Sequence, residues 1–291
     1  MNWSGRVPAE PDFDGDGPGI RLRSFDFNQL PGERGSEEYN NAIREYVERL
    51  TQQCLDLTAL TDELPWTTVG RKDNMTCDHL QVAGTPLRLF RHIAKFAAPA
   101  EVVLGLYSAL NYTRVVDPYA WLVETKEGCE GSVGADYEWC HVAWTVDSIH
   151  PLFAVRDFVT LDFANAKESL IVSRSVKHGS APETSPPTHT SFIFKNLGSR
   201  TYRVPLLYAL RVVPVDAFNC TVTQLQWSDV GGVLPIKIIE ESNERFGYDN
   251  LTRMRKIAKT AMERQVTVPI ENPLLPGWTS DPYVKIPELR Q

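Results

Sequence analysis

The sequence contains no apolar run that approaches the roughly 18–20 residues needed by a membrane-spanning helix. Its opening stretch, MNWSGRVPAEPDFDGDGPGI, has neither a basic start nor an apolar segment, so it does not resemble a secretory signal. The five cysteines are widely spread without a C-x-x-C pair, which is typical of reduced thiols rather than of a disulfide framework or a zinc site. We therefore expect a cytoplasmic protein without a metal or cofactor.

Signatures of common enzyme classes are also missing. The chain has no G-x-S-x-G nucleophile elbow, no H-E-x-x-H pair, no phosphate-binding P-loop and no dinucleotide fingerprint. Its six histidines form no pair at the spacing of metal ligands. The formal net charge of −7 is unfavourable for a general nucleic-acid binder. We expect a protein that is not an enzyme and has no catalytic residues.

Composition divides the 291 residues into three parts. Residues 1–35 are rich in Gly, Pro and Asp and are predicted to form a disordered leader. Residues 36–265 are predicted to form one folded domain, and the Pro-rich stretch 266–291 a loose or surface-bound tail. The domain begins with SEEYNNAIREYVERLTQQCLDLTAL, whose apolar residues recur every three or four positions behind a possible cap at Ser36. A helix over 36–60 is therefore expected.

Strand signals dominate the rest of the domain. Three strands are expected between residues 66 and 96, two helices between 99 and 120, and six or seven strands between 121 and 228, with a Pro- and Ser-rich loop at 177–189. A long helical region follows at 233–265, which Gly247 is expected to kink or interrupt. A meander of this length favours one curved antiparallel sheet whose apolar face is covered by the last helix.

Large side chains on these strands are candidates for the covered face. They are Trp144, Phe153, Phe158, Leu161, Phe192, Phe194, Tyr208 and Trp227. Such residues can either fill a packed core or line a cavity for a ligand, and composition alone leaves both alternatives open.

The stretch HPLFAVRDFV places a charged pair, Arg156 and Asp157, inside an apolar run. Charged residues are seldom fully buried without a partner. The pair can be a salt link at the start of a strand, or one member can meet a polar group of a ligand inside. If the strand has begun, the two side chains point to opposite faces.

The run HPLFAVRDFVTLDFA resembles the START (StAR-related lipid transfer) domain family, whose sheet has a strand that begins R-D-[FY]-V after a proline-containing loop. LNYTRVVDPY is similar to the family's Y-R-x-x-W-D segment, and SLIVSRSVKHGSAPETSPP to its strand ending in S-V-x-H before a loop with prolines. CTVTQLQWSDVGGVLP is similar to the entry into the last helix, and LTRMRKIAK to the end of that helix. Each motif is weak alone, whereas together they are collinear over residues 36–265.

The resemblance implies an α+β helix-grip fold, in which a curved antiparallel sheet wraps around a long C-terminal helix and encloses a hydrophobic tunnel. It implies a lipid-binding protein that holds one sterol, phospholipid or related lipid and transports it between membranes. The expected location is cytoplasmic and peripheral at membranes, with transient contact to the membrane surface.

The resemblance also assigns roles to polar residues. Arg156 matches the family arginine that helps to hold a polar head or an ordered water in the tunnel, and Glu138 or Asp136 is its expected acidic partner. The predicted ligand-binding residues are Arg156, Glu138, Asp117, Arg114, Trp144, Phe158, Phe192, Phe194, Tyr208, Trp227 and Ile239. The predicted gate consists of His150, Pro151, Phe153, Leu234 and Pro235.

One segment departs from the family pattern. Asp117 matches the acid of Y-R-x-x-W-D, but the arginine of that segment aligns with Thr113, with Arg114 one position on, and Val116 replaces its tryptophan. These departures weaken an assignment to phosphatidylcholine.

Two alternatives stay open. A helix-grip enzyme, cyclase- or hydrolase-like, would act on a small hydrophobic substrate and would need an internal acid and base, for which His141, Glu138 and Tyr208 are candidates. A lipid-regulated interaction module would contact a protein partner through the tail 266–291.

The last helix carries four basic residues, which can either contact anionic lipid or form an ordinary solvent-exposed face. They are Arg253, Arg255, Lys256 and Lys259.

Overall fold

The computed structural model describes residues 22, 25–61, 63–110, 120–147, 156–181, 202–230 and 234–265. Most of them belong to one antiparallel sheet with the strand order β1-β2-β3-β10-β9-β7-β6-β5-β4, and the short β8 pairs in parallel with β6. The strands are β1 Thr67–Lys72, β2 Met75–Gln81, β3 Arg88–Phe96, β4 Ala120–Gly128, β5 Tyr137–Asp147, β6 Arg156–Asn165, β7 Leu170–Ser175, β8 Tyr202–Arg203, β9 Leu206–Asp216 and β10 Asn219–Ser228. The helices are α1 Glu37–Thr58, α2 Ala100–Leu110 and α4 Ile236–Glu263, with short 3-10 turns η1 Phe27–Gln29 and η2 Glu130–Ser132.

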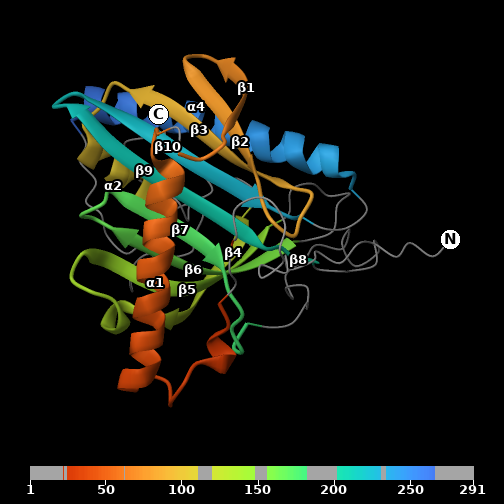
Figure 1. The fold of residues 1–291 in the computed structure, drawn as a ribbon. Helices are drawn as coiled ribbons and strands as arrows, with labels where there is room; N and C mark the ends of the chain where they lie inside the picture. The colour runs from red at the N-terminus through yellow and green to blue at the C-terminus, as the bar shows by residue number, and fades with distance from the viewer. Residues whose placement is uncertain are drawn as a thin grey trace.

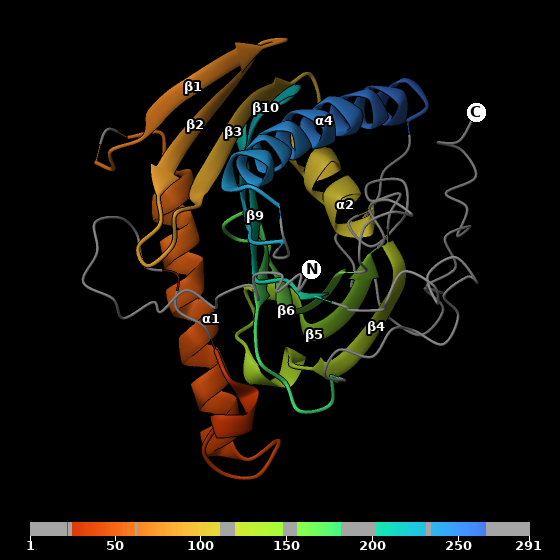
Figure 2. The same ribbon diagram turned by 90° about the vertical axis from the view of Figure 1, so that its right-hand side faces the viewer.

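The sheet is curved, and different helices cover its two faces (Figure 1 and Figure 2). α1 packs on one face, where its apolar residues form a cluster with Leu161, Val172 and Trp227. α2 and α4 lie on the other face and pack against residues such as Phe90 and Leu210. This arrangement confirms the expected α+β class and the curved antiparallel sheet that grips a C-terminal helix.

Local sequence accounts for α1. The Ser36 hydroxyl accepts a hydrogen bond from the Tyr39 backbone N–H at 3.2 Å, and Glu37 and Glu38 lie in the first turn, where the helix dipole favours acids. The residues that recur every three or four positions are buried; they are Tyr39, Ile43, Tyr46, Val47, Leu50, Cys54 and Leu57. The predicted helix is thereby confirmed.

The end of the predicted leader is part of the fold. Leu22 and Phe27 are buried in the cluster that contains α1, and the Phe25 ring stacks on Tyr46 with 4.1 Å between ring centroids. Asp26 also forms a parallel bridge with Lys177. The prediction of disorder up to residue 35 is wrong for these residues, because their aromatic side chains find apolar partners on α1.

α4 is continuous from Ile236 to Glu263, so the kink expected at Gly247 is absent. A Cβ added at this glycine would overlap the His92 ring of β3. The His92 Nε2 donates a hydrogen bond to the Glu244 carbonyl of α4 at 2.8 Å. Gly247 is therefore needed for the close approach of α4 to the sheet rather than for a bend.

Two expected elements and part of a loop lie outside the described residues. The short helix predicted over 113–120 lies outside the described residues apart from Ala120, which begins β4. The loop 177–189 is described only up to residue 181, and the strand predicted over 189–196 lies outside the described residues.

We expect Gly247→Ala to lower the free energy of unfolding by about 2 kcal/mol, because the new methyl group overlaps the His92 ring. In an ordinary helix interior this change would stabilise by about 1 kcal/mol. Urea denaturation of both proteins measures the difference. Ser242→Ala on the exposed face of α4 serves as control and should leave stability nearly unchanged. A stabilised Gly247→Ala protein would contradict the close-approach interpretation.

Candidate functional site

The side chains of Arg156 and Asp157, at the start of β6, lie on opposite faces of the sheet. Consecutive residues of a strand point to opposite sides. Asp157 lies with Trp144 and Val159 on the face covered by α1. By alternation, Arg156 and Phe158 lie on the face covered by α2 and α4. The two charged side chains therefore have different surroundings, as the strand period predicts.

Asp157 is the structural member of the pair. Its side chain is 1% exposed, and Oδ2 accepts hydrogen bonds from Trp144 Nε1 at 3.0 Å and from Arg203 Nε and Nη2 at 3.0 and 2.7 Å. Arg203 belongs to the short strand β8, which runs beside the start of β6. The structure has an ion pair at the start of this strand, and it joins Asp157 to Arg203 of β8.

Arg156 lies where the sheet meets the segment that leads into α4. It is 4% exposed, and its Nε donates a hydrogen bond to the Val230 carbonyl at 3.3 Å. The register places it opposite Asp147 of β5 and beside Tyr202 of β8. Phe158, two residues further along the same face, is half-buried.

The acids predicted to pair with Arg156 lie at the other end of β5. Glu138 is exposed and precedes Trp139, which pairs with Ala164, whereas Arg156 pairs with Asp147. Glu138 and Asp147 are nine positions apart in β5, which is about 30 Å along the strand. Asp136 accepts a bond from Lys167 Nζ at 3.3 Å. The predicted partnership is therefore wrong for both acids, because the register separates them from Arg156.

Two of the aromatic residues predicted to line the ligand site lie on the face that α1 covers, not on the face of α4. Trp144 and Trp227 belong to the cluster beneath α1, where Trp227 is fully buried 5.8 Å from the Arg174 guanidinium. Tyr208 lies on the face of α4, and its hydroxyl accepts a hydrogen bond from Asn250 Nδ2 at 3.3 Å. The strand period alone does not identify which alternate residues face α4, so the sequence did not separate Trp144 and Trp227 from Tyr208.

The other predicted residues fall into two groups. Ile239 is buried in the cluster that includes α1, Leu234 is half-buried, and Pro235 is exposed as the N-cap of α4. Seven residues lie outside the described residues and stay predictions: Arg114, Asp117, His150, Pro151, Phe153, Phe192 and Phe194.

A polar stripe on the buried side of α4 was not predicted. Asn243, Gly247 and Asn250 are buried and follow one another at spacings of four and three residues, which places them on one side of the helix. Asn250 Nδ2 donates to Gln224 Oε1 of β10 at 2.8 Å, and Asn243 bonds with Ser228, whose hydroxyl donates to Asn243 Oδ1 at 2.7 Å. A three-four spacing of polar residues usually indicates a solvent-exposed face, so the sequence carried only a misleading signal.

Several buried polar atoms near this stripe have no hydrogen-bond partner among the residues that the structure describes. They are Gln224 Nε2, Gln226 Oε1, Asn250 Oδ1 and His92 Nδ1. Leaving a buried polar group without a partner costs about 1–3 kcal/mol. The face beneath α4 therefore offers both donors and acceptors to a polar group of a ligand, or to water.

Two buried histidines lie on this face. Burial lowers the pKa of His92 to about 4 and that of His141 to about 3. His141 stacks on Trp139 with 5.2 Å between ring centroids, and its Nε2 lies 3.9 Å from Asp162 Oδ2, which is too long for a hydrogen bond. Both imidazoles are therefore neutral near pH 7.

The described ranges contain no group of three or more His, Cys, Asp or Glu side chains placed to hold a metal ion. In the same part of the chain, no helix combines the length and apolar character needed to cross a membrane.

The fold is similar to that of solved START-domain structures. Human STARD10 is 14% identical, with 74% of this chain and 80% of that chain covered and a TM-score of 0.55. Human StAR-related lipid transfer protein 5 is 16% identical, with 74% and 95% covered and a TM-score of 0.56. The human StarD13 (DLC2) lipid transfer and protein localization domain is 17% identical, with 73% and 95% covered and a TM-score of 0.50. No model of a known protein family and no curated protein matches the sequence. At these identities the similarity establishes a START-like fold.

The neutral histidines predict a pH dependence. Since their folded-state pKa values lie below the ordinary 6.5, the unfolded chain binds more protons below about pH 6.5, and stability falls as the pH is lowered. We expect a loss of about 2 kcal/mol for each histidine between about pH 7 and pH 5. Urea denaturation at several pH values measures this loss. Imidazole NMR titration provides the check, because His92 and His141 should show no protonation above pH 5.

We expect Arg203→Met to lower the free energy of unfolding by about 2 kcal/mol, because it removes the cationic partner of the buried Asp157 carboxylate, which also accepts a hydrogen bond from Trp144. Arg211→Met is the matched control, since Arg211 is similarly exposed and lies 4.0 Å from the half-exposed Glu168. Thermal and urea unfolding should place the control within about 0.5 kcal/mol of the wild type. Equal losses in the two variants would argue against a structural role for the Asp157 pair.

Proposed function

We propose that this START-like domain holds one lipid between the sheet and α4 and transports it between membranes. The observation that carries the proposal is the set of buried polar atoms beneath α4, on an otherwise apolar face of a helix-grip fold. An apolar lipid body gains burial both in a membrane and in a protein interior, so its exchange between the two costs little. A few internal polar groups then select the headgroup, because leaving them unpaired is unfavourable.

Arg156 is the cation best placed to contact the headgroup. Its face, its burial and its bond to the Val230 carbonyl put it at the junction between β6 and the start of α4. A guanidinium presents several donors in a fixed fork, which suits a phosphate, carboxylate or water-bridged hydroxyl. Asp157, on the opposite face of the sheet, forms an ion pair with Arg203.

The start of α4 suits the entry of a lipid. Pro235 is its N-cap and provides no side-chain hydrogen bond, so the first turn lacks the stabilisation of a polar cap. The exposed side chains of Ile236 and Ile238 follow at 40% and 47% exposure. A weakly held helix end with apolar surface favours opening at a membrane, next to the predicted gate at Leu234 and Pro235.

An enzymatic role has weaker support. Of the three residues considered as acid or base, Glu138 lies exposed at the far end of β5, and only His141 and Tyr208 share the face of α4. Burial lowers the pKa of His141 to about 3 and raises that of Tyr208 well above its usual value. Neither group exchanges protons readily near pH 7, which favours binding over catalysis.

We expect native mass spectrometry of the protein, after incubation with vesicles of mixed lipids, to detect one lipid per chain. Arg156→Met should lower the retention of lipids with anionic or phosphate heads about tenfold, because a charge-assisted hydrogen bond is lost. Arg211→Met, which changes the same residue type at the surface, should retain lipid as the wild type does. Wild-type protein that extracts no lipid would overturn the proposal, and equal retention by Arg156→Met would remove Arg156 from the site.

A further inference from the structure

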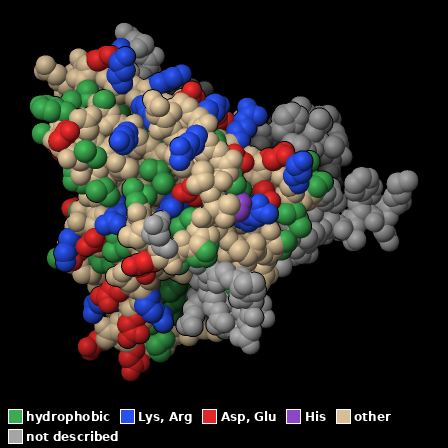
Figure 3. Space-filling view, turned by 45° about the horizontal axis from the view of Figure 1, so that its top comes forward, with side chains coloured by type: hydrophobic (Ala, Val, Ile, Leu, Met, Phe, Trp, Pro, Cys, Tyr) green, Lys and Arg blue, Asp and Glu red, His purple; other side chains and the backbone are tan. Residues whose placement is uncertain are grey.

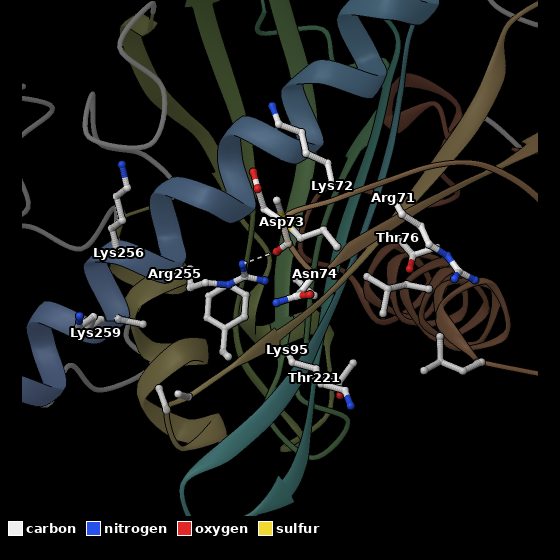
Figure 4. Close-up of a pocket in the computed structure, with 18 residues that line it drawn as sticks. Arg71, Lys72, Asp73, Asn74, Thr76, Lys95, Thr221, Arg255, Lys256 and Lys259 are labelled. Carbon is white, nitrogen blue, oxygen red and sulfur yellow. Dashed lines mark hydrogen bonds between the residues drawn. The ribbon is translucent and has the colours of Figure 1, made fainter.

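A groove of about 1050 Å³ lies at the C-terminal end of α4, between this helix, the β1–β2 turn and the end of β3 (Figure 4). Its helical wall is formed by Arg255, Lys256, Ala258 and Lys259, whereas Arg156 lies beside the segment that precedes the start of α4. The groove is therefore separate from the candidate lipid site. We call it the basic groove.

Cations from three elements line the basic groove. They are Arg71 and Lys72 of β1, Lys95 of β3, and Arg255, Lys256 and Lys259 of α4. The one carboxylate among the lining residues is Asp73, so the lining carries a formal charge of +5 in a protein of net charge −7. Gathering like charges from separate elements is unfavourable in the free protein, and a bound anion would relieve the repulsion.

The acidic and basic residues of α4 are unevenly distributed between its two halves. Residues 236–249 contain two cations and four acids, whereas residues 250–263 contain four cations and one acid, Glu263, which lies 3.8 Å from Lys259. Figure 3 shows several Lys and Arg side chains over the upper part of the visible face. Acids in the first half and cations in the second also suit the helix dipole. Three of the four cations in the second half, Arg255, Lys256 and Lys259, line the basic groove.

Arg255 is preorganised at the centre of the basic groove. Its Nη1 donates to the Asp73 carbonyl at 3.0 Å, and its guanidinium lies 5.6 Å from the centroid of the Phe96 ring. The left-handed backbone of Asp73 and Asn74, with φ of 51° and 59°, forms the turn that presents this carbonyl. The Arg255 Nε and Nη2 are buried and have no hydrogen-bond partner among the described residues.

The floor and the rim of the basic groove differ in character. Met75, Phe96 and Ala258 make the floor apolar, which strengthens charge interactions at its surface because it displaces water. Lys256 and Lys259 are exposed on the rim, and Figure 4 places them on α4 to one side of Arg255, with Arg71 on the other side. Cations on both sides of Arg255 suit a ligand that carries more than one anionic group.

We propose that the basic groove binds a ligand that carries two or more phosphate groups, either a soluble molecule or the headgroup of a lipid. Arg255 supplies the paired donors for one phosphate, as a guanidinium fork does for such oxygens, and the rim lysines neutralise the others. This site goes beyond the carriage of a lipid beneath α4 and does not depend on it.

The test is calorimetric titration of the full chain with inositol hexakisphosphate. We expect saturable binding that weakens as the salt concentration rises. The double variant Lys256→Glu/Lys259→Glu should bind at least about tenfold more weakly, since two exposed contacts to phosphate are reversed in charge. Arg49→Glu/Arg245→Glu makes the same charge change at exposed helix positions outside the groove and should bind as the wild type does. Arg255→Lys, which keeps the charge and removes the fork, should also weaken binding.

A second arm identifies the source of the phosphates. Flotation with vesicles that contain a bisphosphorylated inositol lipid is compared with vesicles of phosphatidylserine at matched surface charge. Preference for the inositol lipid supports a headgroup ligand, and binding of inositol hexakisphosphate without vesicle binding supports a soluble one. The proposal is overturned if neither probe binds, if both double variants lose binding equally, or if both kinds of vesicle bind and do so to the same extent. None of these readouts depends on lipid carriage beneath α4.

Discussion

The close approach of α4 to the sheet at Gly247 is the contact on which the rest of the structure depends. Without a Cβ at this position, the His92 ring fits against the helix and bonds to the Glu244 carbonyl. The approach also brings Asn243 and Asn250 within hydrogen-bonding distance of β10. Because these contacts are polar and specific, they fix the position of α4 over the sheet more tightly than apolar packing alone would do.

The two faces of the sheet differ in the contacts that they make. The face of α1 holds an apolar cluster and the Asp157–Arg203 ion pair, which together stabilise the fold. The face of α4 carries Arg156 and buried polar atoms that the described fold leaves available. Consecutive side chains of a strand point to opposite faces. In the Arg156–Asp157 dipeptide, Asp157 therefore contributes to stability and Arg156 to the candidate site.

α4 joins the candidate lipid site and the basic groove in one rigid element. Its first half lies over the polar stripe, and its second half presents the cations of the groove. The proposed lipid site and the basic groove therefore lie along opposite halves of the same helix, which approaches the sheet closely at Gly247.

The sequence by itself determined the elements whose signals are local, which are the capped helix α1, the three strands between residues 66 and 96 and the long last helix. The START resemblance supports the order of the remaining strands. Caps, turns and periods depend on residues a few positions apart, so they can be interpreted without knowing the fold. Only the tertiary structure decided that Trp144 and Trp227 face α1, that Glu138 is remote from Arg156, and where the cations of the basic groove meet. These outcomes depend on strand register and on contacts between residues as distant as Asp73 and Arg255, which no local pattern encodes.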